Sequence, residues 1–161
     1  MSYTIPAQTH IGHVHLKVAD LDRALSFYKD LLGFEITQRY GDSAVFISAG
    51  GYHHHIGLNT WHSKNAGPAP VRSAGLYHLA IVYPIRKDLA AIFKRLTDAE
   101  YPLTGASDHG VSEAIYLNDL DGNGVELYWD RPKDQWPVNT EGKLWLGTAA
   151  LDIDSLLAEL D

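Results

Sequence analysis

An internal repeat limits the folds that this chain can adopt. When residues 12–18 are laid over residues 77–83, His13 coincides with His78, and the match continues without a gap into the next apolar segment of each copy. Each copy has the pattern of a strand followed by a helix. The sequence therefore predicts two similar α/β modules in tandem, and any proposed fold has to accommodate both of them.

The spacing of apolar residues predicts a helical segment in each copy. Apolar residues recur every three or four positions within residues 24–32, as on the buried face of a helix. Asp20 before this segment and Gly33 after it are the expected caps. The pattern returns from Asp88 onward, and Pro102 lies beyond the expected end of that helix.

Short apolar runs broken by turn residues follow each helix and predict strands. The expected strands are residues 34–39, 44–48 and 53–60 in the first copy, and residues 103–104, 114–118 and 124–129 in the second. Each module therefore has the order β-α-β-β-β. Matching the last strands of the two copies places Gly57 at the position equivalent to Glu126.

Length and composition fit one compact domain. The chain has 161 residues, of which 45% are hydrophobic, enough for a single core. We expect one domain over residues 1–161, with module one at about 10–60, a connection at 61–74, module two at about 75–131 and a C-terminal extension at 132–161. A short amphipathic helix at 152–160 is expected to pack against the domain or against a partner subunit.

The repeat places three residues with metal-binding side chains at symmetry-related positions. His13 and His78 are equivalent, and Glu126 is equivalent to Gly57, so three of the four related positions carry a ligand. Two imidazoles and one carboxylate leave coordination positions of a divalent metal open, which favours chemistry over a structural site. His15 is an alternative to His13, because residues two apart in a strand share a face, and only the repeat register favours His13.

Charge excludes several classes of partner. The net charge is −7 and the sequence contains no cysteine, so there is no basic stripe for nucleic acid or an anionic membrane and no disulfide or thiolate site. No apolar run approaches the length of a membrane span. We expect a cytoplasmic protein that acts on a small molecule.

The modules and their ligand positions resemble the vicinal oxygen chelate superfamily over about residues 10–131. The run Val-Ala-Asp-Leu-Asp-Arg-Ala at residues 18–24, then Phe27-Tyr28 and Leu32-Gly33, is similar to segments common to that superfamily. The superfamily includes extradiol dioxygenases, glyoxalase I, fosfomycin-resistance proteins and metal-free drug-binding proteins. The resemblance implies an α+β fold in which two tandem βαβββ modules form a curved mixed sheet around a metal-binding cup.

A narrower resemblance concerns residues 109–126, which look like the pattern of type I extradiol dioxygenases. His109, Ile115-Tyr116, Asp119, Gly122 and Glu126 stand at the spacing of that pattern, although Leu120 replaces the Pro that it contains. A second match puts His54, within Tyr52-His53-His54-His55, at the acid–base histidine of these enzymes. A polar surface cluster is the alternative for that histidine run.

The resemblance implies a metal-dependent extradiol dioxygenase that cleaves a catecholic ring with O₂. The expected metal is Fe(II), with Mn(II) or another divalent ion as the alternative, held by His13, His78 and Glu126. The expected catalytic residues are His54, His109 and Tyr116. The superfamily also suggests a homodimer.

Three other functions stay open on the sequence. A glyoxalase-like isomerase is less favoured because Gly57 stands where that enzyme has a carboxylate ligand. A thiol transferase shares the His, His, Glu triad but has no evident use for His54, His109 and Tyr116. A metal-free protein that binds aromatic drugs is the alternative outside catalysis.

Overall fold

The computed structural model describes residues 2–161 and divides the chain into two compact units. The first unit ends at Gly67 and the second is Pro68–Asp161, so the boundary lies in the predicted connection. Each unit holds one of the two predicted modules. That the two units form a single domain stays a prediction.

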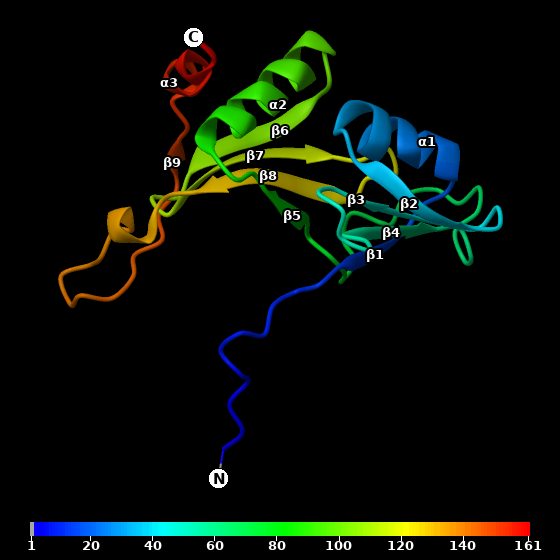
Figure 1. Ribbon diagram of the computed structural model, residues 1–161, viewed down its shortest axis with the longest axis horizontal. Coiled ribbons are helices and arrows are strands. Elements are labelled where there is room, and N and C mark those ends of the chain that lie inside the picture. The colour runs from blue at the N-terminus through cyan, green and yellow to red at the C-terminus, as the bar shows by residue number, and fades with distance from the viewer. Residues whose placement is uncertain (1) are drawn as a thin grey trace. The chain divides into compact units, whose positions relative to one another are not determined.

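The first unit is a four-stranded mixed sheet covered by a helix (Figure 1). The sheet order is β1-β4-β3-β2, and only the β1–β4 pair is parallel. Its elements are β1 (Val14–Lys17), α1 (Leu21–Leu25), a π-helical continuation η1 (Ser26–Leu31), β2 (Glu35–Tyr40), β3 (Ala44–Ser48) and β4 (Ile56–Asn59).

Both predicted caps of the first helix are confirmed. The Asp20 carboxylate accepts a hydrogen bond from the Arg23 backbone N–H at 2.7 Å, which satisfies one of the free amides of the first turn. Gly33 has φ +89°, a left-handed conformation that ends a helix at low cost for glycine. Between them, Phe27 and Tyr28 are almost fully buried and face the core of this unit.

The second unit is a five-stranded mixed sheet in the order β5-β8-β7-β6-β9, again with one parallel pair, β5–β8. Helix α2 has Leu89 and Leu96 fully buried on its inner face. The elements are β5 (Leu79–Val82), α2 (Arg86–Asp98), β6 (Leu103–Asp108), β7 (Ser112–Asn118), β8 (Gly124–Asp130), a 3₁₀ turn η2 (Lys133–Gln135), β9 (Ala149–Ala150), α3 (Ile153–Leu157) and a 3₁₀ turn η3 (Ala158–Leu160).

The two units repeat each other in strand register. Val14 pairs with Ile56 in the first unit, and Leu79 pairs with Val125 in the second. His13 and His78 each directly precede the first residue of these pairs. The predicted equivalence of the two histidines, and that of Gly57 with Glu126, are therefore confirmed within the folded units.

Several predicted boundaries are wrong, including that of β7, which begins at Ser112 and not at residue 114. Residues 53–55 lie in a loop and not in a strand, because β4 pairs with β3 only over Ala44–Ile47 and with β1 only from Val14 onward. The strand predicted at residues 103–104 extends to Asp108 and receives β9 on its outer edge. Helix α2 begins at Arg86, two residues before the predicted start.

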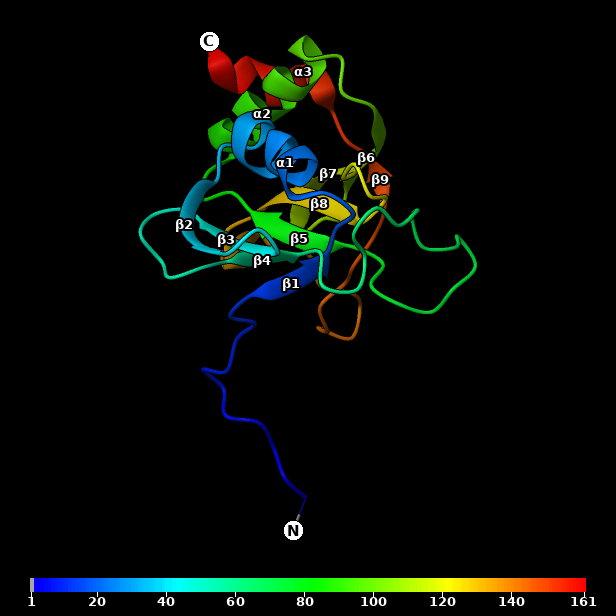
Figure 2. The same ribbon diagram turned by 90° about the vertical axis from the view of Figure 1, so that its right-hand side faces the viewer.

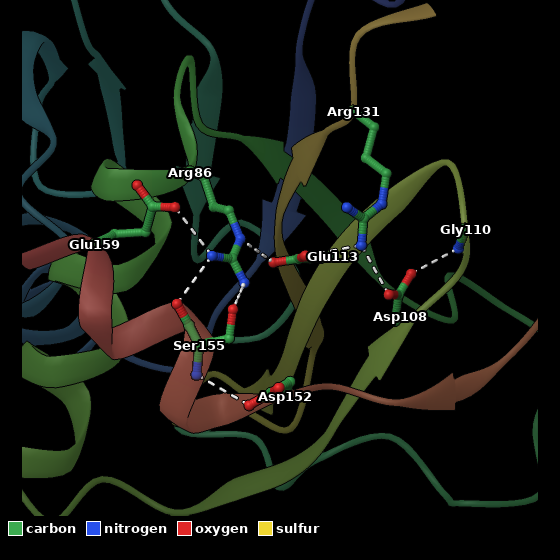
Figure 3. Close-up of polar contacts among 8 residues, drawn as sticks. All are labelled: Arg86, Asp108, Gly110, Glu113, Arg131, Asp152, Ser155 and Glu159. Carbon is green, nitrogen blue, oxygen red and sulfur yellow. Dashed lines mark hydrogen bonds and ion pairs between the residues drawn. The ribbon is translucent and has the colours of Figure 1, made fainter. Parts of the chain in front are cut away.

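The C-terminal extension is anchored to its own unit by a helix and by an ion pair of Glu159 with Arg86. Helix α3 lies beside α2 (Figure 2). The side chain of Leu156 on α3 is fully buried. Arg86 donates to Glu113 at 2.8 Å and to Glu159 at 3.0 Å, and Arg131 joins Glu113 to Asp108 (Figure 3). The expected packing of this helix against the domain is thus observed.

No helix within residues 2–161 is both long and apolar enough to cross a membrane.

Candidate active site

Two of the predicted metal ligands lie together in the second unit. His78 Nε2 is 3.0 Å from Glu126 Oε2, and both side chains are partly buried. His78 directly precedes β5, while Glu126 is the third residue of β8. The parallel pairing of these strands brings the two side chains to the same place although 48 positions separate them in sequence.

A chain of hydrogen bonds extends from Glu126 through the two predicted catalytic residues of this unit. The Tyr116 hydroxyl lies 2.9 Å from Glu126 Oε1 and 2.7 Å from His109 Nε2. Tyr116 and Glu126 are direct cross-strand partners on β7 and β8. His109 lies in the turn between β6 and β7, where its backbone N–H donates to Ser112 O at 2.9 Å.

The surroundings of Tyr116 keep its hydroxyl protonated. Burial raises the pKa of Tyr116, and the hydrogen bond to Glu126 raises it further, since a nearby carboxylate disfavours a phenolate. The neutral hydroxyl has a single proton and two polar neighbours. It donates that proton to Glu126 Oε1, and His109 Nε2 is the second polar neighbour, 2.7 Å from the same hydroxyl oxygen.

The remaining predicted residues meet in the first unit. The rings of His13 and His54 are 4.4 Å apart between centroids, and His54 Nδ1 is 2.7 Å from His53 Nδ1. Desolvation, followed by the nearby imidazole of His13, lowers the pKa of His54. His53 and His54 lie in a loop outside any strand, so their rings do not alternate between two faces of a sheet.

His15 has a different environment from His13. Its ring lies against Gly57, where an added Cβ would come within 2.8 Å of it, and it contacts Phe46 and Trp61 at centroid distances of 5.8 and 5.3 Å. In the second unit the pair equivalent to His15 and Gly57 is Ala80 and Glu126. The large and small side chains are thus exchanged between the two copies.

The donor atoms in the second unit fit a divalent metal. His78 and Glu126 supply one nitrogen and one oxygen 3.0 Å apart, a separation that allows both to bind one ion at metal–ligand distances of about 2 Å. Tyr116 holds the other carboxylate oxygen and orients it. Within residues 2–161, no group of three or more His, Cys, Asp or Glu side chains is already arranged to hold a metal, and His13 belongs to the other unit.

One contact at this site was not anticipated from the sequence. His109 Nδ1 lies 2.8 Å from the carbonyl oxygen of Gly147, in the C-terminal extension. The contact depends on the pairing of β9 with β6. A two-residue strand has no periodic signal in the sequence, so no local pattern could have predicted it.

Comparisons with known proteins agree with this architecture. The sequence pattern of the Glyoxalase/Bleomycin resistance protein/Dioxygenase superfamily matches residues 10–127. A solved glyoxalase/dioxygenase from Nostoc punctiforme superposes with a TM-score of 0.64 at 15% identity, covering 82% of this chain and 99% of that one. At that identity the likeness concerns the fold alone.

Two curated relatives carry names of different enzymes. A catechol-2,3-dioxygenase of Bacillus subtilis (strain 168) is 39% identical over 97% of this chain, which spans 54% of that relative's length. A metallothiol transferase FosB of Staphylococcus epidermidis is 24% identical over 83% of this chain and 92% of its own length. Because the family pattern matches residues 10–127 and the dioxygenase relative matches 97% of the chain, this chain belongs to the Glyoxalase/Bleomycin resistance protein/Dioxygenase superfamily.

Proposed function

We propose that this protein is a metal-dependent extradiol-type dioxygenase that cleaves a catecholic ring with O₂. The observation that carries the proposal is the hydrogen-bonded chain His109–Tyr116–Glu126, which ends beside His78. It joins proton-transferring side chains to two side chains suited to a metal. The 39% identity to a catechol-2,3-dioxygenase supports the same reaction class.

In this proposal His13, His78 and Glu126 hold Fe(II), with Mn(II) as the alternative. The metal, when bound, supplies a Lewis acid for two adjacent catechol oxygens and the redox chemistry needed for O₂. The three protein ligands leave coordination positions for both reactants. Bringing the reactants together lowers the entropic part of the barrier.

His54 acts as the base for the substrate. Its Nδ1 is engaged with His53 at 2.7 Å, so Nε2 is the nitrogen available to accept the proton of a catechol hydroxyl. The lowered pKa keeps this imidazole neutral near pH 7, as a general base requires. The same nitrogen then returns the proton as the ring opens.

His109 and Tyr116 bind and orient the oxygen that gains negative charge. The Tyr116 hydroxyl donates a hydrogen bond to that substrate oxygen. His109 Nε2, 2.7 Å from the hydroxyl, accepts the Tyr116 proton. Donors fixed in advance stabilise charge without reorganising during the reaction. Phe46 and Trp61, which contact the histidines of the first unit, are candidates to pack against the aromatic ring.

Metal-dependent thiol transfer is the second candidate. The metallothiol transferase matches over 92% of its own length, whereas the catechol dioxygenase extends well beyond the part that this chain covers. A transferase of that kind needs the His, His, Glu triad but gives His54, His109 and Tyr116 no assigned role. An isomerase or a metal-free drug-binding protein would assign a role to still fewer of these residues.

Oxygen consumption tests the proposal directly. Protein loaded with Fe(II) without air is mixed with a panel of substituted catechols in aerated buffer, and O₂ uptake is recorded for wild type, His54→Ala and His10→Ala. His10 is an exposed histidine of the N-terminal segment and serves as the matched control. We expect uptake by wild type and His10→Ala, with a loss of about 100-fold or more in His54→Ala, the usual size for a general base.

The absence of uptake with every catechol while the metal content is stoichiometric would reject the dioxygenase. Equal uptake by wild type and His54→Ala would leave the dioxygenase in place and remove His54 from its mechanism. Metal-dependent consumption of a thiol in the absence of any catechol activity would instead support the transferase.

A further inference from the structure

The ring of His109 contacts the C-terminal extension through Nδ1, the nitrogen that does not contact Tyr116. Its Nδ1 lies 2.8 Å from Gly147 O, while the Gly147 N–H donates to the His109 backbone carbonyl at 3.2 Å. A carbonyl oxygen has no proton to give, so Nδ1–H is the donor. In the neutral form of a ring that donates through Nδ1, the lone pair is on Nε2, which is the nitrogen that faces Tyr116.

We propose that Gly147 is a positioning residue that fixes the tautomer and orientation of His109, so that Nε2 is presented to Tyr116 as a proton acceptor. The inference rests on the proposed function, in which His109 and Tyr116 act on the substrate oxygen. With the opposite tautomer, Nε2 would carry the proton and could take none from Tyr116. The C-terminal extension therefore sets the direction in which a proton can move along the chain.

Strand pairing brings Gly147 to this place. Strand β9 begins two residues after it and pairs with the end of β6, Ala149 opposite Asp108. The turn that carries His109 is also fixed, since Asp108 accepts from Arg131 at 2.7 Å and from the Gly110 N–H at 2.7 Å (Figure 3). The segments that carry His109 and Gly147 are therefore both fixed by contacts other than the one between the two residues.

A side chain at position 147 would collide with the indole ring of Trp145. An added Cβ would lie 2.0 Å from the ring of Trp145, and the same ring lies 3.5 Å from a Cβ added at Gly110. The backbone of Trp145 is fixed within the extension, since its backbone N–H donates to Pro137 O at 2.9 Å. Any larger residue at 147 has to displace either this ring or the carbonyl that His109 uses.

Thr148 does not supply the same restraint. Its hydroxyl lies 3.4 Å from His109 Nδ1, longer than the 2.8 Å to Gly147 O. A hydroxyl can also donate as well as accept, so it does not select one tautomer. Removing it by Thr148→Val should leave the tautomer of His109 unchanged.

The test reads the tautomer and the catalytic rate in the same full-length protein. Nitrogen-15 NMR of histidine-labelled protein, prepared without a paramagnetic metal, identifies the ring nitrogen of His109 that carries the proton. The variants are Gly147→Ala, the double variant Trp145→Ala/Gly147→Ala and the control Gly67→Ala, where nothing lies within 4 Å of an added Cβ.

We expect a proton on Nδ1 in wild type and in Gly67→Ala, and loss of this single tautomer in Gly147→Ala. In Gly147→Ala, kcat for a catechol should fall about 10-fold with KM nearly unchanged, the size found when an outer partner that orients a functional imidazole is removed. The double variant relieves the clash with the indole ring and should recover both the tautomer and most of kcat.

The inference and the proposed function fail in different ways. A proton on Nε2 alone in wild type would overturn the inference whatever the activity, and so would an unchanged kcat in a Gly147→Ala protein that has lost the tautomer. If no catechol is cleaved, the proposed function fails, while the NMR comparison of wild type with Gly147→Ala still decides whether Gly147 positions His109. If Gly147→Ala does not fold, the wild-type spectrum and the double variant decide the matter.

Discussion

His15 and Gly57 show how a single residue can decide the chemistry of a repeated fold. The His15 ring fills the space that a side chain at Gly57 would need, whereas the second unit has the small Ala80 opposite Glu126. An added side chain at Gly57 would therefore have to displace an imidazole. This packing is a physical reason why the first copy carries no counterpart of Glu126.

The first prediction concerns this pair. Gly57→Ala should lower the free energy of unfolding by about 1–3 kcal/mol, because overpacking moves the His15 ring out of its place. In a His15→Ala background the same change should cost much less. Urea unfolding of the two single variants and the double variant measures the coupling. Equal costs of Gly57→Ala in both backgrounds would contradict the account.

The second prediction concerns Glu113, which is 3% exposed and is bound by both Arg86 and Arg131. Glu113→Gln leaves two guanidinium groups without their shared carboxylate and should cost about 3 kcal/mol, the lower end for a broken buried pair, because both arginines remain partly exposed. Urea unfolding measures the loss. Glu141→Gln removes an exposed carboxylate paired with Lys143, and that control should change stability by less than about 1 kcal/mol.

At the scale of elements, the short helix α3 depends on its packing more than on its own length. A five-residue helix is not stable alone, and α3 is held by the Asp152 cap, the Arg86 hydrogen bonds and the buried side chain of Leu156. Its loss would also affect β9, which directly precedes it and lies next to the His109 contact.

The third prediction is that Leu156→Ala lowers the free energy of unfolding by about 3 kcal/mol, because it leaves a cavity between α3 and α2. Thermal unfolding followed by circular dichroism measures the change. Val71→Ala removes apolar atoms from a fully exposed side chain and should have almost no effect. A Leu156→Ala protein as stable as this control would show that α3 is not packed as described.

The fourth prediction concerns the junction of β5 and α2. Burial, followed by the charge of Asp88, raises the pKa of Tyr83 to about 12. Because the folded pKa lies above the unfolded value near 10, this contribution to stability is complete below pH 10 and is lost as pH rises toward 12. Urea unfolding between pH 9 and 12 should show a shallower decline for Tyr83→Phe than for wild type, and identical slopes would contradict it.

At the scale of the whole molecule, the proposed ligands come from both units. His13 belongs to the first unit, whereas His78 and Glu126 belong to the second. A metal that binds the folded chain through all three residues would stabilise it through mass action, by about 2.7 kcal/mol at a free concentration 100 times the Kd. Such binding would make the stability of one unit depend on a residue of the other.

The fifth prediction follows from that linkage. A divalent metal should raise the melting temperature of wild type and of His10→Ala, and EDTA should reverse the rise. His13→Ala and Glu126→Ala should each lose most of the shift and bind less metal when titrated by calorimetry. A His13→Ala protein that keeps the full shift would place the metal in the second unit alone.

The sequence by itself determined the repeated module, the caps of the first helix and the equivalence of His13 with His78 and of Gly57 with Glu126. These features depend on local periodicity and on the equivalence of positions in the two copies, and both can be read from the order of residues alone. It also predicted four site residues in the second unit, and the fold brings His78, His109, Tyr116 and Glu126 into one chain of polar contacts, while their functional roles stay a prediction.

Only the tertiary structure decided where β4 begins, how His53 and His54 face each other, and which backbone atom holds His109. Each of these depends on pairing between distant segments, whose register is set by the packing of whole sheets and not by local propensity. The Gly147 contact is the clearest case, since it requires a two-residue strand to pair with the edge of β6. A single glycine within the extension carries no local signal of that pairing.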